Sequence, residues 1–329
     1  MTVSTSLNAT RLVRLQLGQE STWGTQATAT AILNGVQPTP TITPTVKSVI
    51  FDEQLGSLVP AYHQAQVELG GSFDMKGYVT YEDILYLLSG VYGLPTPAGS
   101  YTWTFTIPST TAWTPVSYTM ELGIAGSSTA TKLVGGLFQD WSITGSEAKE
   151  LTFTAKGFGQ SVSYGVTPTS LSYHTPCEMA LMPQVAVAMG VAGTGVGSLT
   201  AYSGSLVNFT LSGNSGLVPF KAAGSKYPAS WCYTKQTLGL KVAMAYTSTL
   251  QTFIGANQLA GSPVVLQLKA TSGAKIIEID FAGALKSDPV YWGDSQGAQI
   301  VELDMDAVYD ATDAFYTKVV VTNTVATLA

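Results

Sequence analysis

A serine hydrolase signature is the first pattern in the sequence that could carry chemistry. Residues 293–297 read GDSQG, the Gly-x-Ser-x-Gly spacing, with Ser295 in the position of the nucleophile. Such a serine needs a turn between a strand and a helix, and it needs an imidazole base. The residues that follow alternate as in a strand, and the two histidines, His63 and His174, lie beside turn residues, where hydrogen bonding at the surface is the commoner role. We predict a hairpin turn here and no catalytic residue.

A glycine-rich stretch at 189–198 (MGVAGTGVGS) has part of the spacing of a dinucleotide-binding loop. Ser198 takes the place of the third glycine, no helical pattern follows, and no acid for a ribose appears before Glu278. We therefore predict a flexible loop. The sequence has no P-loop, HExxH motif or Cys/His cluster, so neither a cofactor nor a metal site is expected.

Two further features bear on the compartment. The cysteines, Cys177 and Cys232, lack metal-ligand spacing and are too few for a disulfide framework, which favours two buried thiols in a reducing compartment, with a single disulfide as the alternative. Arg11 and Arg14 interrupt the place where a signal peptide has its apolar run, and no later stretch approaches about 18 apolar residues. We expect neither export by that route nor a membrane span.

The composition indicates a packed protein that is sparing with charge. Of 329 residues, 45% are hydrophobic and 11% are charged, and 33 glycines and 15 prolines imply frequent turns. The length suggests two domains of ordinary size. A charged fraction this far below the usual ~25% favours self-association.

Alternation with period two recurs along the whole chain and predicts a mainly β protein. In 64–78 it places Val67, Leu69, Phe73 and Met75 on one face of a half-buried strand. Comparable patterns predict strands at 117–124, 151–158, 264–270, 275–281 and 299–307.

A helical pattern is clearest at 80–93. Thr80 is a candidate N-cap, Glu82 and Asp83 lie in the expected first turn, and Gly90 is a candidate stop. The apolar stripe of this short amphipathic helix would consist of Ile84, Leu87 and Leu88.

Four pieces of the first half recur in the same order in the second half, and their collinearity indicates an internal duplication. SLVP at 57–60 matches GLVP at 216–219, and the strand with Leu69, Phe73 and Met75 matches one with Leu238, Val242 and Met244. The helix at 83–90 matches 249–256, and 151–156 matches 301–306. We predict two copies of one β-rich domain, 1–168 and 169–329, joined near 163–175.

A row of acids lies on one face of the strand predicted at 299–307. Glu302, Asp304 and Asp306 follow one another at spacing two, about 6.6 Å apart. Such a row could line a lumen and repel a DNA backbone, face bulk solvent, or bind a cation. Glu68 and Asp74 take similar positions on the strand at 64–78. The first-half positions that match the acidic row are not acidic, namely Thr152, Thr154 and Lys156.

The net charge of −6 gives no overall attraction to nucleic acid or to anionic membranes. Residues 179–277 contain six lysines and no acid, whereas the rest of the chain is acidic. This segregation could steer neighbouring subunits together, in which case assembly should slow as salt rises from ~0.05 to ~0.5 M. The alternative is that these charges are merely solvated.

The sequence resembles the major tail tube proteins of long-tailed bacteriophages, in the larger form that carries two tube domains. The resemblance rests on strand and turn patterns in four segments: 18–25 (GQESTWGT), 70–93 (GGSFDMKGYVTYEDILYLLSGVYG), 118–160 and 296–323. It implies two tandem β-sandwich or barrel domains, each with a short flanking helix. It also implies a non-enzymatic virion protein whose rings have inner strands joined into one barrel and stack into a tube for the genome.

Further expectations follow from this resemblance. Single-domain members form hexameric rings, so two domains on one chain predict a trimer with pseudo-sixfold symmetry. Expected partners are other copies of the chain, the tape measure protein and DNA in the lumen, and the tail tip and tail terminator proteins. The location would be the virion tail, assembled in the host cytoplasm, without a membrane.

We expect two segments to act as arms that contact an adjacent ring, 36–46 and the stretch around Glu20, Ser21, Thr22 and Trp23. Deleting residues 1–25 should then permit folding but hinder stacking. The alternative function is a two-domain β-sandwich that decorates a virion or binds glycans, for which the six tryptophans could form a face. A hydrolase remains a third class, which a change at Ser295 would test.

Overall fold

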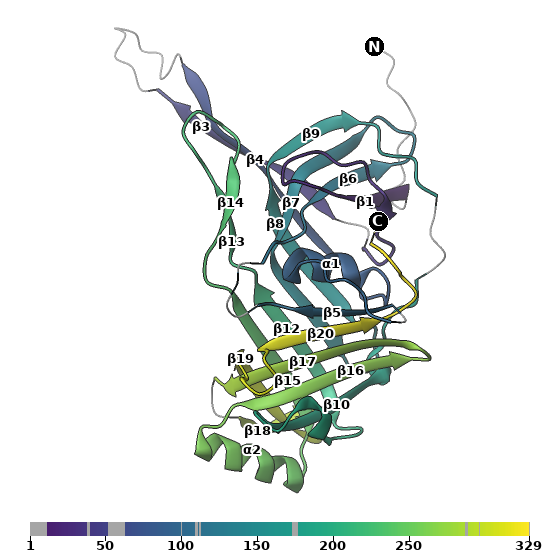
Figure 1. The fold of residues 1–329 in the computed structure, drawn as a ribbon, viewed down its shortest axis with the longest axis vertical. Coiled ribbons are helices and arrows are strands. Elements are labelled where there is room, and N and C mark those ends of the chain that lie inside the picture. The colour runs from purple at the N-terminus through teal and green to yellow at the C-terminus, as the bar shows by residue number, and fades with distance from the viewer. Residues whose placement is uncertain are drawn as a thin grey trace.

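The computed structural model describes residues 12–37, 40–51, 63–99, 101–108, 111, 113–172, 177–286, 289–295 and 297–328. The fold is mainly β and its strands pair antiparallel, with two α-helices in the described part (Figure 1). The helices are α1 (Ile84–Tyr92) and α2 (Ser248–Ala260), and single 3₁₀ turns occur at Met182–Gln184 and Val196–Ser198. The first nine strands are β1 (Val13–Gln19), β2 (Ala31–Ile32), β3 (Thr41–Ile50), β4 (Gln64–Tyr78), β5 (Thr102–Thr106), β6 (Tyr118–Ile124), β7 (Ala130–Ser146), β8 (Thr152–Gly159) and β9 (Ser161–Val166). The others are β10 (Val185–Val191), β11 (Thr200–Ala201), β12 (Leu206–Asn214), β13 (Leu217–Phe220), β14 (Ser230–Tyr233), β15 (Thr237–Ala245), β16 (Val264–Ser272), β17 (Lys275–Leu285), β18 (Val290–Ser295), β19 (Ala298–Ala307) and β20 (Thr317–Thr322).

One continuous sheet, which we call the inner sheet, runs through both halves of the chain. Its eight strands pair in the order β3–β4–β8–β7–β12–β15–β19–β18. The two halves meet where β7 pairs with β12, from Ser146 opposite Asn208 to Asp140 opposite Asn214. The strands predicted at 64–78, 151–158 and 299–307 all belong to this sheet, and so confirm the period-two patterns.

Two smaller outer sheets pack against the inner sheet. In the first half β2–β1–β6–β7–β9 are paired. The other outer sheet, β11–β10–β16–β17–β20–β5, consists of second-half strands with β5 of the first half at its end. β7 belongs to both layers: its first part pairs with β6 and β9, and its second part pairs with β8 and β12. It changes layer near Gly135, whose φ of 74° is in the region that favours glycine.

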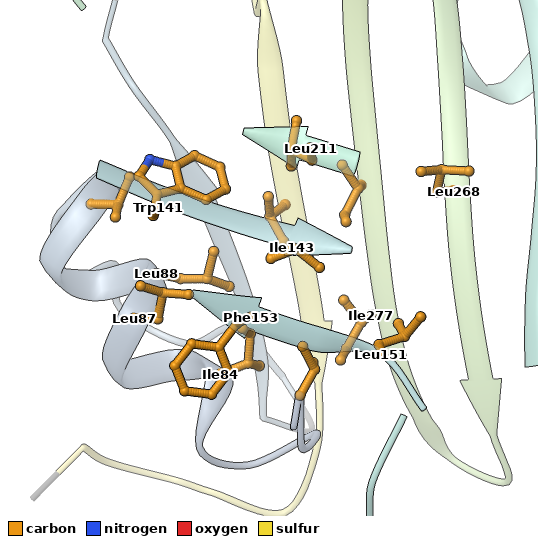
Figure 2. Close-up of a cluster of buried hydrophobic side chains, with 14 of the residues drawn as sticks. Ile84, Leu87, Leu88, Trp141, Ile143, Leu151, Phe153, Leu211, Leu268 and Ile277 are labelled. Carbon is orange, nitrogen blue, oxygen red and sulfur yellow. The ribbon is translucent and has the colours of Figure 1, made fainter. Parts of the chain in front are cut away.

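The core lies between these layers and extends through both halves. Figure 2 shows side chains of α1 beside Phe153 and Trp141 of the first half, with Leu211 and Ile277 of the second half in the same cluster. These buried side chains form one contiguous cluster, so the apolar core is continuous between the two halves.

The predicted helix is confirmed, but its ends differ from the prediction. Thr80 lies before the helix, where its Oγ1 accepts a hydrogen bond from the backbone N–H of Asp83 at 3.0 Å. Gly90 lies inside the helix and not at its end. A Cβ at this position would stand 2.2 Å from Cδ2 of Phe138. This glycine therefore allows close packing of α1 against β7. The helix ends before Gly93, whose N–H donates to the carbonyl of Ser89 at 2.9 Å.

The pairing scheme of the first half recurs in the second half. β1–β2, β1–β6, β6–β7, β7–β9, β3–β4 and β4–β8 have counterparts in β10–β11, β10–β16, β16–β17, β17–β20, β12–β15 and β15–β19. α1 follows β4 and α2 follows β15, at corresponding points of the chain. The piece at 57–60 lies outside the described residues, and its predicted match at 216–219 falls largely in β13. The division into two domains at 168/169 stays a prediction, and that position follows β9 and precedes β10.

Two predictions of burial are wrong. Val67 is 45% exposed, because the first part of β4 and most of β3 form a hairpin arm that projects from the body of the protein (Figure 1). Cys232 is exposed on β14 and Cys177 is partly buried, and the two are free thiols. The thiol of Cys177 lies near Asn34 and Asp83, and burial together with the charge of Asp83 raises its pKa to about 12.

Candidate assembly surfaces

The face of the inner sheet that points away from the core is polar across six strands, from β4 to β19. We call it the polar face. Two rows of facing residues cross it. One row is Tyr78, Thr152, Thr144, Thr210, Lys241 and Asp304, and the other is Lys76, Thr154, Ser142, Ser212, Gly239 and Asp306.

Short hydroxyl side chains and paired charges make up most of the polar face. Lys156 pairs with Asp74 at 3.1 Å, and Lys241 pairs with Asp304 at 3.1 Å. Lys286 lies 3.6 Å from Asp306. Five carboxylates stand against four lysines, which leaves one net negative charge: Asp74, Asp140, Glu302, Asp304 and Asp306 against Lys76, Lys156, Lys241 and Lys286.

Four of the predicted lumen residues therefore come together on this face, namely Asp74, Glu302, Asp304 and Asp306. Glu68 does not join them. It lies on the hairpin arm and is paired with Lys221, and the hydrogen bond from this lysine lowers the pKa of its carboxyl. Thr152 and Thr154 lie in the same rows as the acids of β19, so the polar face is acidic at its second-half end and neutral in its middle.

Each end of the inner sheet is a strand with one paired edge. Among the described residues β3 pairs only with β4, and β18 pairs only with β19. Near the tip of the hairpin arm, large apolar side chains are open to solvent, with Ile50 65% exposed. Val46, Val49 and Phe51 are also exposed there. Unpaired edges with apolar side chains are ready sites for pairing with another chain.

Part of the predicted N-terminal arm is bound to its own chain. The Glu20 carboxylate is 6% exposed and accepts hydrogen bonds from the hydroxyls of Ser117 and Thr119 and from the backbone N–H groups of Gly24 and Gly135, at 2.8 to 3.0 Å. Trp23 Nε1 donates to the carbonyl of Gly135 at 2.9 Å. These two residues thus hold β7 at the point where it changes layer, whereas Ser21 and Thr22 are exposed.

The deletion expected to spare folding would remove a core strand. β1 pairs with β6 along seven residues, and Leu15 and Leu17 are buried. We therefore expect loss of residues 1–25 to unfold the first outer sheet. The segment GQESTWGT thus holds β7 in place through Glu20 and Trp23. The sequence did not reveal this role, because a charged residue such as Glu20 is expected at the surface.

The β13–β14 hairpin supports the hairpin arm from its side (Figure 1). Besides the Lys221 pair with Glu68, the backbone N–H of Leu69 donates to the carbonyl of Lys226 at 2.8 Å. Leu217 is buried against Leu137 and Phe158. These contacts join an element of the second half to the projecting element of the first half.

Two of the tryptophans whose side chains are described are buried and three are half-buried. Trp103 and Trp141 lie in the main core, and Trp23, Trp113 and Trp231 surround the smaller cluster at Leu217. The side chain of Trp292 is outside the described set. Trp113 and Trp231 also pack against the ring of Tyr233, at 5.8 and 5.0 Å between ring centroids.

Ion pairs inside the chain account for most of the lysine-rich segment. Four of its six lysines have acidic partners: Lys221 with Glu68, Lys241 with Asp304, Lys269 with Glu278, and Lys275 with Glu82 and Glu178. Hydrogen bonds to Glu82 and Glu178 raise the pKa of Lys275, and those from Ser272 and Lys275 lower the pKa of Glu178. Most of the lysines in this segment are thus paired with carboxylates of the same chain, and steering of neighbouring subunits by charge stays a prediction.

The two enzyme-like motifs occupy turns. β18 ends at Ser295 and β19 begins at Ala298, and the N–H of Gly297 donates to Asp294 Oδ1 at 3.4 Å, so the predicted hairpin turn is confirmed. The glycine-rich stretch spans the end of β10 and a loop. His63 is the first described residue after 52–62, which the structure does not describe, and His174 also lies outside the described residues. In the part of the chain that the structure describes, no three His, Cys, Asp or Glu side chains are grouped as metal ligands, and no helix is long and apolar enough to span a membrane.

Comparison with known proteins gives one clear match. The model of a family described as phage tail tube protein matches residues 10–324, which is nearly the whole chain. A search of curated proteins found no match.

Proposed function

Because the chain belongs to the phage tail tube protein family, we propose that three copies close into a ring and that the rings stack into the hollow tube through which DNA leaves the virion. The observation that carries this proposal is the inner sheet. It is continuous through both halves, it is polar on one face, and each of its end strands has an edge that no described strand occupies. A sheet of this kind closes when its two ends meet across copies.

The recurring pairing scheme supports a duplicated chain and names the strands that would close the ring. β3 corresponds to β12, since each pairs with the strand that leads into a helix. β18 corresponds to the second part of β7. β18 pairs with the strand that follows it, β19, and the second part of β7 pairs with the strand that follows it, β8. The β7–β12 junction within the chain is therefore the template for a junction between β18 of one copy and β3 of the next. Two such halves on each chain make three copies equivalent to six halves.

The polar face suits the wall of a channel for DNA. A basic wall would bind phosphates and release counterions, which slows passage. This face has one net negative charge, and most of its lysines are neutralised by neighbouring carboxylates. We propose that it lines the lumen, with DNA and the tape measure protein as its contents. The tail tip and terminator proteins would cap the two ends of a tube assembled in the host cytoplasm.

The hairpin arm is the element that we assign to stacking. Its apolar side chains are exposed well away from the core, and among them is Val46, at the end of the 36–46 segment predicted to reach an adjacent ring. Glu20 and Trp23 cannot fill that role while they hold Gly135, which leaves Ser21 and Thr22 as the exposed residues of the other predicted arm.

A purified full-length chain tests the proposal directly. Mass photometry should give a particle of three chains, and negative-stain micrographs should show rings and tubes. A stable monomer, or a ring of six chains, would contradict it.

A second experiment tests which surface lines the tube. Glu302, Asp304 and Asp306 are replaced together by lysine, and tubes are mixed with double-stranded DNA at ~0.05 M salt before washing. If the polar face lines the lumen, DNA should be retained inside the tubes of the variant and not in wild-type tubes. The control is Glu147→Lys, which changes an exposed turn. Retention on the outside of the variant tubes would contradict the assignment.

A further inference from the structure

The two helices occupy corresponding places in the chain but differ in burial. α1 follows β4 and α2 follows β15, and each leads to the hairpin of its outer sheet. All nine residues of α1 are buried. In α2 only Leu250, Ile254 and Asn257 of thirteen residues are buried, and the helix lies at the end of the molecule remote from the hairpin arm (Figure 1).

Strands of both halves contribute to the cover of α1. β5 of the first half contacts the helix, and β20 of the second half pairs with β5. The hydroxyl of Tyr92 in α1 is 3.4 Å from that of Thr317 in β20, and the Tyr92 ring packs edge-on against Phe105 of β5 at 6.4 Å. Asn323, just after β20, donates to the carbonyl of Tyr81 at 2.7 Å.

The exposed side of α2, which we call its open face, lacks the charged residues of a helix that faces water. None of its thirteen residues, STLQTFIGANQLA, is charged. Leu259 is 91% exposed, and the other exposed side chains are small or uncharged. Helices that face water normally carry charged residues on their outer side. This composition fits a surface that is covered in the assembled protein.

β9 is the first-half counterpart of β20. β9 follows β8 and pairs with β7, just as β20 follows β19 and pairs with β17. β20 has a second partner in β5, whereas β9 has no second strand partner among the described residues. Tyr164 of β9 is 63% exposed.

We propose that β9 of a second copy of the chain contacts α2 and helps to cover it, as β20 meets α1 at Tyr92 within the chain. This inference rests on the proposed ring. Within the chain, the half that supplies β12 to the inner sheet also supplies β20 to α1. The same relation between copies means that one neighbour supplies both β3 to the edge of β18 and β9 to α2. The open face of α2 is thus a second contact surface between chains in one ring, outside the inner sheet.

A charge on the open face should prevent ring closure without unfolding the chain. Leu259→Glu changes a side chain that is almost fully exposed in the single chain, so the unfolding temperature of dilute protein should not change. In the ring the carboxylate would be buried without a partner, and the chain concentration at half-assembly should rise at least about tenfold. Leu94→Glu is the control, since Leu94 is exposed but lies outside α2 and β9, and should leave assembly unchanged.

A disulfide test identifies the partner strand. Leu259→Cys and Tyr164→Cys are introduced together in a chain whose two native cysteines are serine. Oxidation of assembled rings should give cross-linked species of two and three chains, and each single cysteine variant should give far less. Intact rings with Leu259→Glu and no cross-link in the double variant would overturn this inference while leaving the ring proposal standing. If the wild-type chain forms no ring, the proposed function itself fails.

Discussion

The two halves of the chain share one pairing scheme but fix the loop after their first strand by different means. In the first half the Glu20 carboxylate lies in the loop itself and accepts four hydrogen bonds, one of them from the layer-changing position Gly135. In the second half Asp310 reaches the loop from the far end of the half, and accepts from the N–H groups of Gly193 and Thr312, both within 2.9 Å. Strand pairing is thus common to the two halves, whereas the loop after the first strand is held in each half by a single carboxylate at a different position.

The largest effect is expected from Glu20→Ala. It leaves four donors without their acceptor in a buried place, and releases β7 where it passes between layers. We expect a loss of about 3 kcal/mol or more in the free energy of unfolding, measured by urea denaturation. Glu20→Gln should lose less, because its amide oxygen still accepts. A loss below ~1 kcal/mol for the alanine variant would show that the clamp is not needed.

Asp310→Ala should have a smaller effect, because its carboxylate accepts from two donors, whereas that of Glu20 accepts from four. We expect a loss of about 2 kcal/mol in the free energy of unfolding. Faster hydrogen exchange should be confined to the amides near Gly193 and Thr312. Faster exchange that spreads to the first half would contradict this prediction, since it would mean that the two loops are not held independently.

The contact between the halves at Lys275 should contribute less again. Lys275→Met removes pairs with Glu82 and Glu178 that are partly open to water, and should lower the free energy of unfolding by about 1 kcal/mol near neutral pH. The folded-state pKa of Glu178 lies below its ordinary value of 4.5, so its contribution is present above that pH and is lost as pH falls through the folded pKa. The difference between wild type and variant should therefore shrink below pH 4.5. A difference that stays constant down to pH 3 would contradict this origin.

The smallest effect is expected where the hairpin arm meets β13–β14. Glu68→Gln removes an exposed ion pair with Lys221 and should leave the unfolding temperature unchanged. Hydrogen exchange at the amide of Leu69, which donates to Lys226, should nevertheless become a few times faster, because the arm is less firmly held. Lys149→Gln, at an exposed turn, is the control that should leave this amide as it was.

The sequence allowed the strands and the helix to be predicted because periodic patterns are local signals, and it allowed the family to be predicted because the resemblance rests on strand and turn patterns in four segments. It located Asp74, Glu302, Asp304 and Asp306 on strand faces correctly, since the period of a strand decides which side a residue takes. It could not show that Glu20 is buried. Three of the four donors that offset the cost of burying its carboxylate lie 97 to 115 residues further along the chain, at the start of β6 and in β7. It could not place Glu68 either, because only the tertiary fold brings Lys221 to the arm.

The passage of β7 from the outer layer to the inner sheet has a mechanical consequence. The strand is one covalent segment from Ala130 to Ser146, and it is gripped at Gly135 from both its N–H and its carbonyl. A force applied to the outside of the protein at β6 or β9 is therefore delivered along the backbone to the surface formed by β8 and β12. The first outer sheet and the inner sheet are therefore mechanically coupled, and a displacement of one is transmitted to the other.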